Sequence, residues 1–201
     1  MRRGLRRALL ATGIAVLVLT VAPPLDEYGR RSLVGHMIQH LLHTDVVAPL
    51  LLLGLPALAR PLRAVPPIPS LLFALGGIWA IHFTPLFEAS LEHDGVHVLV
   101  HALFLACGLL MWAPVFDPGR LAPLLRAAYV FVALPLAGLL GFALHVTRAP
   151  LYPHYVALCG AGALADQHAG ADVMWLGGCL LMFAAFMVVM LELARHEQAA
   201  A

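Results

Sequence analysis

The long apolar runs of this chain constrain its fold more than any other feature. Val46 to Leu58 and Leu176 to Leu191 contain no charged side chain, and 62% of the 201 residues are hydrophobic whereas 11% are charged. A water-soluble domain has too little interior to hide this much apolar surface. Several runs reach the roughly 20 residues that cross a hydrocarbon core about 30 Å thick. The sequence therefore predicts an all-α fold, a polytopic bundle of transmembrane helices.

The apolar runs group into six segments, separated by stretches rich in proline and glycine, which interrupt helices. Each segment is long enough for one crossing, so we expect a single integral membrane domain over residues 1–201 with about six membrane-spanning helices. The expected spans are approximately residues 7–23, 33–57, 69–87, 96–115, 124–146 and 171–193, followed by a polar tail at 194–201.

Arginine predicts the orientation, because short loops rich in Lys and Arg stay on the cytoplasmic side. With the amino terminus inside, nine arginines fall on the cytoplasmic side and three on the other. The nine are Arg2, Arg3, Arg6, Arg7, Arg60, Arg63, Arg120, Arg126 and Arg195. We expect a cytoplasmic (inner) membrane protein with both termini in the cytoplasm. The first segment also has features of a signal peptide, but Pro23 and Pro24 make a poor cleavage site, so we favour a retained anchor.

This threading places ten of the eleven histidines at the outer ends of the spans, and only His196 lies in the polar tail, where we expect it to be solvated. Imidazole is expensive in lipid and is the commonest protein metal ligand. His36 and His40 lie one helical turn apart, as do His97 and His101, so each pair faces one partner surface. Paired imidazoles in a membrane segment are costly unless they line a cavity, bind a ligand or pair. We therefore expect these four to form a functional site.

Other polar residues of the same layer are secondary candidates. His82, near the outer end of the third span, and Asp166, in the last outer loop, are added as possible metal ligands. His145 and His154 are interpreted as interfacial polar residues. Asp45 lies roughly one-third to halfway down the second span, and the sequence leaves open whether it pairs with a histidine or arginine or is neutral.

A layer of histidines at one membrane face is compatible with several functions. Two or three neutral imidazoles suit a transfer site for copper as Cu(I), whereas histidines on two facing helices hold a haem axially. The repeated HxxxH pairs are also typical of membrane di-iron oxygenases. The ligands of those enzymes face the cytoplasm, however, whereas the predicted orientation puts these histidines on the outer side of the membrane. A metal-free scaffold with hydrogen bonds between helices is a further alternative. No set of nucleophile, base and orienting group is recognisable, so we do not expect an enzyme.

The charge pattern narrows the choice of partners. The net charge is +1, and no basic run follows the amino-terminal arginines, so nucleic acid is not an expected partner and membrane lipid is. The three cysteines, Cys107, Cys159 and Cys179, share no CxxC spacing, and we interpret them as inert side chains rather than ligands.

The stretch from His36 through Met37, Gln39 and His40 to Pro56 resembles the signature of the CtaG-like multi-pass family of cytochrome c oxidase assembly factors. Further motifs resemble the family pattern in its order, over most of residues 32–190. They are Trp79, His82 and Pro85; His97 and His101 followed by Trp112 and Pro114; Pro150 to Pro153; and Asp166 to Gly170 with Met174 and Trp175.

The resemblance implies an inner-membrane protein that assists the maturation of a haem-copper oxidase. The expected partner is the catalytic subunit of cytochrome c oxidase, and the expected mechanism is delivery of copper from a histidine site on the periplasmic side. His43 and Asp45 depart from the family pattern and inherit no role from it. Val100 and His168 also stand where the family usually has other residues.

Overall fold

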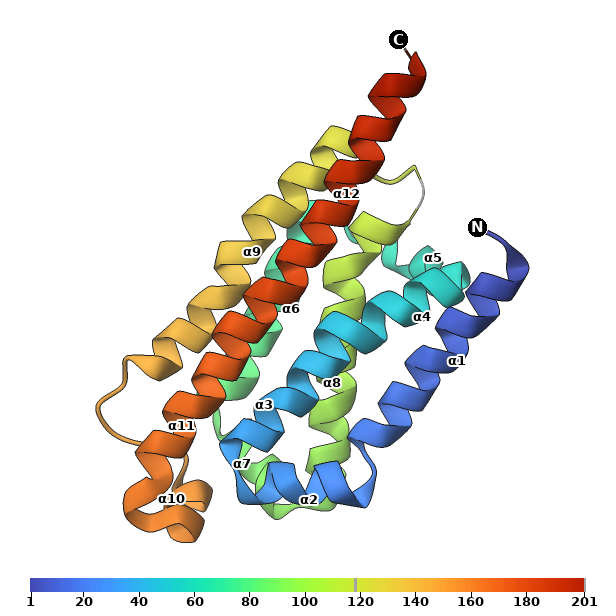
Figure 1. Ribbon diagram of the computed structural model, residues 1–201. Helices are drawn as coiled ribbons and strands as arrows, with labels where there is room; N and C mark the ends of the chain where they lie inside the picture. The colour runs from blue at the N-terminus through green and yellow to red at the C-terminus, as the bar shows by residue number, and fades with distance from the viewer. Residues whose placement is uncertain (118, 201) are drawn as a thin grey trace.

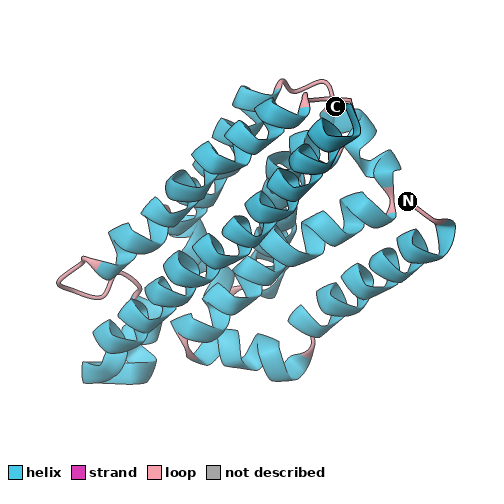
Figure 2. Cartoon of the chain, turned by 45° about the horizontal axis from the view of Figure 1, so that its top comes forward, coloured by secondary structure: helices cyan, strands magenta, loops and turns pink. Residues whose placement is uncertain are grey.

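The structure is a computed structural model that describes residues 1–117 and 119–200, without the side chains of residues 196, 197, 199 and 200. The solvation expected for His196 therefore lies outside the described side chains. Within the described residues every regular element is a helix and none is a strand, which confirms the all-α prediction (Figure 2). Four helices are long and apolar enough to cross a membrane, or six if each of two bent pairs counts as one span.

The long helices overlap the expected spans. The second span consists of α3 (Leu33–Leu41), a π-helical turn η1 (Leu42–Val47) and α4 (Ala48–Gly54) in direct succession. The other long helices in this part of the chain are α1 (Arg3–Thr20), α6 (Pro67–Phe83), α8 (Asp94–Phe116) and α9 (Pro123–His145). Large apolar side chains such as Ile68, Phe73 and Leu180 are exposed on the outside of the bundle, as expected of a surface that faces lipid.

The last segment differs from the sequence prediction. Residues 153–170, expected in a loop, are helical, and residues 153–195 form one candidate span of 43 residues. Its elements are α10 (Pro153–Cys159), the short turn η3 (Gly160–Gly162), α11 (Ala163–Asp172), the π-helical turn η4 (Val173–Gly177) and α12 (Gly178–Ala200). Pro153 begins α10, and the chain turns back at Gly160, where φ is +54°, so that the Leu151 N–H just before α10 donates to Gln167 Oε1 of α11 at 2.7 Å. At 1.5 Å per residue, residues 163–195 alone are about 50 Å long, which exceeds the hydrocarbon core, so part of them lies outside the membrane.

Short helices cover the two ends of the bundle. The helices α2 (Pro23–Arg31), α7 (Pro85–Glu92) and α10 lie at one end, and each begins with proline in its first turn. The turn η2 (Pro56–Leu58) and helix α5 (Ala59–Leu62) lie at the other end, which also holds both chain termini (Figure 1). Two termini at one end agree with an even number of crossings.

Glycine allows the spans to approach closely where they cross. A Cβ added to Gly108 of α8 would lie 2.8 Å from the Cα of Thr44 in η1, and one added to Gly54 of α4 would lie 2.6 Å from the backbone nitrogen of Leu10 in α1. Membrane helices pack through such small residues because lipid supplies no hydrophobic force between them. These contacts set the rotation and depth of the second span against its neighbours.

An ion pair joins two segments at the end that holds the termini. Arg63 donates hydrogen bonds to both carboxylate oxygens of Asp117, at 2.6 and 2.7 Å. The Asp117 side chain is 3% exposed, and Arg120 of the same loop donates to the backbone carbonyl of Val65. The hydrogen bonds from Arg63 lower the pKa of Asp117 below its ordinary value of 3.8.

This lowered pKa of Asp117 predicts a loss of stability in acid. A carboxyl group whose pKa is lower in the folded state stabilises the fold above its unfolded pKa, and it loses that contribution as the pH falls through the folded value. We expect the melting temperature of the detergent-solubilised protein to fall between about pH 5 and about pH 3, and to fall less in an Asp117→Asn variant. An equal fall in both proteins would contradict this assignment.

Candidate metal centre

Six histidine side chains from three spans meet inside the bundle, in the half that is covered by α2 and α7 (Figure 1). We call this set the histidine cluster. Its members are His36, His40, His43, His82, His97 and His101, and their exposed fractions range from 0 to 5%. Neighbouring ring centroids within the set lie between 4.3 and 6.1 Å apart. The structure thus places five of the six predicted ligands, His82 included, and also His43 in one buried cluster.

Three members of the cluster are arranged to hold a metal ion. His36, His40 and His101 each offer a ring nitrogen, and these nitrogens all lie within 4.8 Å of one another. We call these three residues the histidine trio. Neutral imidazoles in this number bind copper, zinc or iron. Both members of the first predicted pair therefore belong to the trio, but only one member of the second pair does.

The ring nitrogens of the cluster have few hydrogen-bond partners. Within the cluster, six buried imidazole nitrogens have no hydrogen-bond partner among the described residues: His36 Nε2, His40 Nδ1 and Nε2, His82 Nε2, and His101 Nδ1 and Nε2. A buried polar group without a partner costs about 1 to 3 kcal/mol. So many unpartnered nitrogens in one place favour a site that binds an ion over a site that only packs helices together.

Hydrogen bonds behind the cluster determine which nitrogen of each ring is free. The Tyr155 hydroxyl donates to the Gly29 carbonyl at 2.6 Å and lies 3.2 Å from His36 Nδ1. Because the hydroxyl has one hydrogen, His36 Nδ1 must donate to it, and the lone pair of the ring is on Nε2. His82 Nδ1 likewise donates to the Ile78 carbonyl at 2.8 Å. Metal-binding histidines are commonly oriented by such a hydrogen bond from the second nitrogen.

His97 is engaged differently from the trio. Its Nδ1 lies 3.1 Å from the Ser90 carbonyl and its Nε2 lies 2.7 Å from an Asp26 carboxylate oxygen. Both neighbours accept hydrogen bonds, so with Asp26 ionised the ring donates from both nitrogens and has no lone pair for a metal. His97 is therefore a neighbour of the trio, and its ring centroid lies 4.3 Å from that of His101.

Asp26 is a residue of this site that the sequence interpretation missed. It lies on α2, where Arg30 pairs with it at 3.0 Å and also with Asp94 at 2.9 Å. A signal for Asp26 was present in the sequence, because the predicted threading puts residues 24–32 on the same side as the histidine layer. Hydropathy alone does not show which histidine the carboxylate of Asp26 contacts.

Asp166 lies outside the histidine trio. Its two carboxylate oxygens accept hydrogen bonds from the Ser32 hydroxyl and from the backbone N–H of Leu33, each at 2.6 Å. These bonds join α11 to the first turn of α3, whose N–H groups have no partner within the helix. The structure therefore gives Asp166 a helix-capping position and does not bring it to the other predicted ligands.

The remaining histidines of the predicted layer make local polar contacts. The ring of His154 donates to the Arg30 carbonyl, and the ring of His168 donates to the Thr147 carbonyl, each at 2.9 Å. His145 Nδ1 lies 2.8 Å from an Asp172 carboxylate oxygen. His43 Nδ1 donates to the Gln39 carbonyl at 2.7 Å, and its ring borders that of His101.

Aromatic side chains form the walls of the cluster. Phe104 stacks on His40 with a centroid separation of 3.5 Å, and Phe87 of α7 lies 4.8 Å from His36. Phe87 is 1% exposed and Phe104 is fully buried. Such walls keep water away from the imidazoles, and an apolar shell of this kind controls access to a metal.

The sequence of the chain matches a known protein family. The model of the cytochrome c oxidase caa3 assembly factor family (Caa3_CtaG) matches residues 2–196. An uncharacterized protein of Mycobacterium leprae (strain TN) is 24% identical over 222 residues, which cover 92% of this chain and 34% of that protein. An uncharacterized protein of Mycobacterium bovis (strain ATCC BAA-935 / AF2122/97) is 26% identical over 82% of this chain and 30% of its own length. The chain thus spans about a third of the length of these relatives. No solved structure matches it significantly.

Proposed function

This chain belongs to the cytochrome c oxidase caa3 assembly factor family, and we propose that it binds Cu(I) at the histidine trio and passes it to the catalytic subunit of the oxidase. Membership of the family supports a role in the assembly of cytochrome c oxidase. This role, the metal, the site and the receiving subunit are all part of the proposal.

The observation that supports the proposal is the convergence of three buried imidazoles with unpartnered nitrogens. Neutral imidazoles suit Cu(I), which accepts two or three such ligands. The trio contains no anionic ligand, so the positive charge of the ion is not neutralised in an interior of low dielectric constant. Binding at the trio is therefore reversible, as transfer to a partner requires.

The position of the cluster supports delivery from the periplasmic side. The cluster is carried by α3, η1, the last turn of α6 and the first turns of α8. The ends of α6 and α8 that carry it adjoin α7, at the end of the bundle opposite to both termini and to α5 (Figure 1). Under the orientation predicted from arginine, that end faces the periplasm and the termini face the cytoplasm. Copper that reaches the cell envelope would then enter the site without crossing the membrane.

The packing of the cluster favours a single ion over a haem. Phe104 stacks directly on His40, and Phe87 lies 4.8 Å from His36, so aromatic side chains occupy the space beside the imidazoles that a porphyrin ring would need. A metal-free scaffold would use the imidazoles for hydrogen bonds between helices, whereas both nitrogens of His40 and of His101 have no partner among the described residues.

The proposed function is tested by the copper content of the oxidase. We expect oxidase purified from cells that lack this protein to contain less copper per haem than oxidase from cells that contain it. The wild-type protein and a His93→Ala variant should restore the ratio, because His93 is exposed and lies outside the cluster. A His36→Ala/His101→Ala variant should not restore it. Oxidase with its full copper content in the absence of this protein would overturn the proposal.

A further inference from the structure

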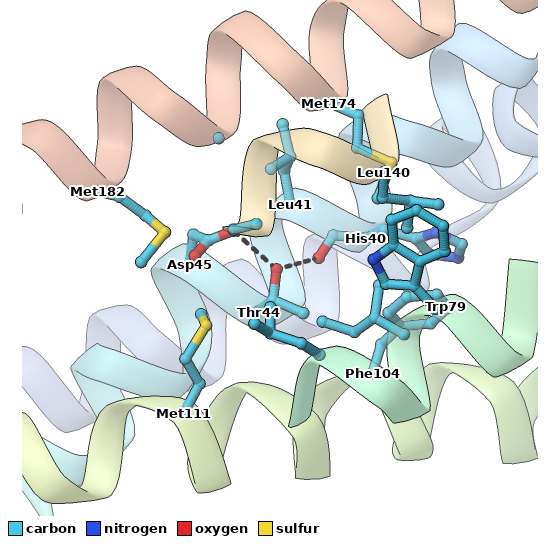
Figure 3. A pocket seen from close by; sticks show the side chains of 14 residues that line it. His40, Leu41, Thr44, Asp45, Trp79, Phe104, Met111, Leu140, Met174 and Met182 are labelled. Carbon is cyan, nitrogen blue, oxygen red and sulfur yellow. Dashed lines mark hydrogen bonds between the residues drawn. The ribbon is translucent and has the colours of Figure 1, made fainter. Parts of the chain in front are cut away.

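A small cavity lies beyond the trio, further along the second span (Figure 3). Its volume is about 40 Å³, and His40 is one of the residues that line it. The other polar and sulfur-containing residues of its lining are Thr44, Asp45, Met111, Met174 and Met182. Asp45 follows His40 by five residues, which is about 7 Å along a helix. The cavity is therefore adjacent to the trio through a shared histidine.

Three of the seven methionines of the chain line this cavity. They come from three different elements: Met111 from α8, Met174 from η4 and Met182 from α12. Figure 3 shows the thioethers of Met111 and Met182 on either side of Asp45, with Met174 nearer to Trp79 and Leu140. Thioether sulfur is a soft ligand that selects Cu(I) over harder cations.

Both π-helical turns of the structure contribute to this cavity. Thr44 and Asp45 lie in η1 of the second span, and Met174 lies in η4 of the last span. A π-helical turn departs from the preferred backbone geometry, and such turns are frequently found at functional sites. Two of them on different spans that line the same cavity favour a ligand site over simple packing.

Asp45 brings a carboxyl group to the wall of the cavity. Its Oδ1 is buried and has no hydrogen-bond partner among the described residues. Its Oδ2 lies 2.8 Å from the Thr44 hydroxyl, which also lies 2.9 Å from the His40 carbonyl. With Asp45 ionised, the single hydroxyl hydrogen cannot serve both oxygens, so the hydrogen bonds of the carboxylate are incompletely satisfied. A cation in the cavity would compensate for this.

We propose that the cavity is a second Cu(I) site, in which Met111 and Met182 supply thioether ligands and Asp45 balances the charge of the ion. A cavity holds one water molecule at about 10 to 15 Å³, so the observed volume accommodates a single ion. His40 borders both sites, which makes it the point at which an ion leaves the trio and moves deeper into the bundle. This inference rests on the proposed function only for the identity of the metal.

The experiment is an anaerobic titration of the purified full chain with Cu(I) against a chelator of known affinity. We expect a Met111→Leu/Met182→Leu variant to bind one ion fewer than the wild type and to lose the copper–sulfur scattering in the X-ray absorption spectrum. Exchange of Met for Leu conserves volume and usually costs less than about 1.5 kcal/mol, so the variant should fold. Met37→Leu is the matched control, because Met37 is fully buried and is not part of the cavity lining.

Each outcome distinguishes this inference from the proposed function. Unchanged Cu(I) stoichiometry and unchanged copper–sulfur scattering in the double methionine variant would overturn the second site. The trio is tested separately by His36→Ala/His101→Ala, which leaves His40 in place as part of the cavity wall. If that variant keeps its full stoichiometry while the methionine variant loses an ion, the second site stands and the trio assignment fails.

Discussion

Replacement of His36 and His101 with alanine is expected to abolish Cu(I) binding at the histidine trio while the chain remains folded. The change removes two of the three converging nitrogen ligands. Loss of a hydrogen-bond partner behind a ligand already costs about 10- to 100-fold in metal affinity, so loss of two ligands should cost more than about 100-fold. The fold should tolerate the change, because it also removes buried nitrogens that have no partner. Metal analysis after anaerobic purification, with a visible absorption spectrum, measures the result.

The matched control for this variant is His145→Ala/His168→Ala. These two rings are also neighbours, with centroids 5.1 Å apart, but they lie outside the histidine cluster. The control should bind as much Cu(I) as the wild type. Equal copper in the trio variant and in the control would contradict the site. A Soret band in the purified wild-type protein would instead support the haem alternative.

Replacement of Asp166 with alanine is expected to destabilise the protein by about 3 kcal/mol without removing copper. The carboxylate accepts two hydrogen bonds of 2.6 Å, one from the Ser32 hydroxyl and one from the Leu33 backbone. Both donors lie at the start of α3. Loss of the carboxylate would leave the Leu33 N–H without this acceptor and would break the link between α3 and α11, whereas Ser32 Oγ would still accept from the Val34 N–H. Thermal unfolding in detergent measures the stability, and metal analysis of the folded protein measures the copper.

Asp166→Asn separates the loss of charge from the loss of the cap. The amide oxygen can still accept one of the two hydrogen bonds, so this variant should lie between the wild type and Asp166→Ala in stability. Both variants should bind Cu(I) in the wild-type amount. Loss of copper with unchanged stability would identify Asp166 as a ligand, as the sequence interpretation proposed, and would contradict the structural role.

The spans of this fold were predictable because hydropathy over about 20 residues is a local property that the bilayer selects directly. Residues 153–170 were not assigned correctly, because Gly160, Gly162 and the polar side chains near Asp166 are typical of a loop. In the structure these residues form two helices, α10 and α11, which fold back on each other at Gly160. A helix that extends beyond the hydrocarbon core has no hydropathy signal to reveal it.

The candidate site was predictable only in part. Helical spacing placed His36 with His40 and His97 with His101, and the structure brings all four into one cluster. Spacing did not show that His97 meets Asp26, because the two residues are 71 positions apart and lie on different helices. It also did not show that both oxygens of Asp166 are used by α3.

The sequence alone therefore determined that the chain is a helical membrane bundle, and it predicted at which level along the membrane normal the histidines lie. Both follow from local quantities, the apolar length of a segment and the rise per residue of a helix. Only the tertiary structure decided which ring nitrogens converge and which are already engaged. The reason is that the rotation and lateral neighbours of each helix depend on contacts between distant segments, such as the close approach of Gly108 to Thr44.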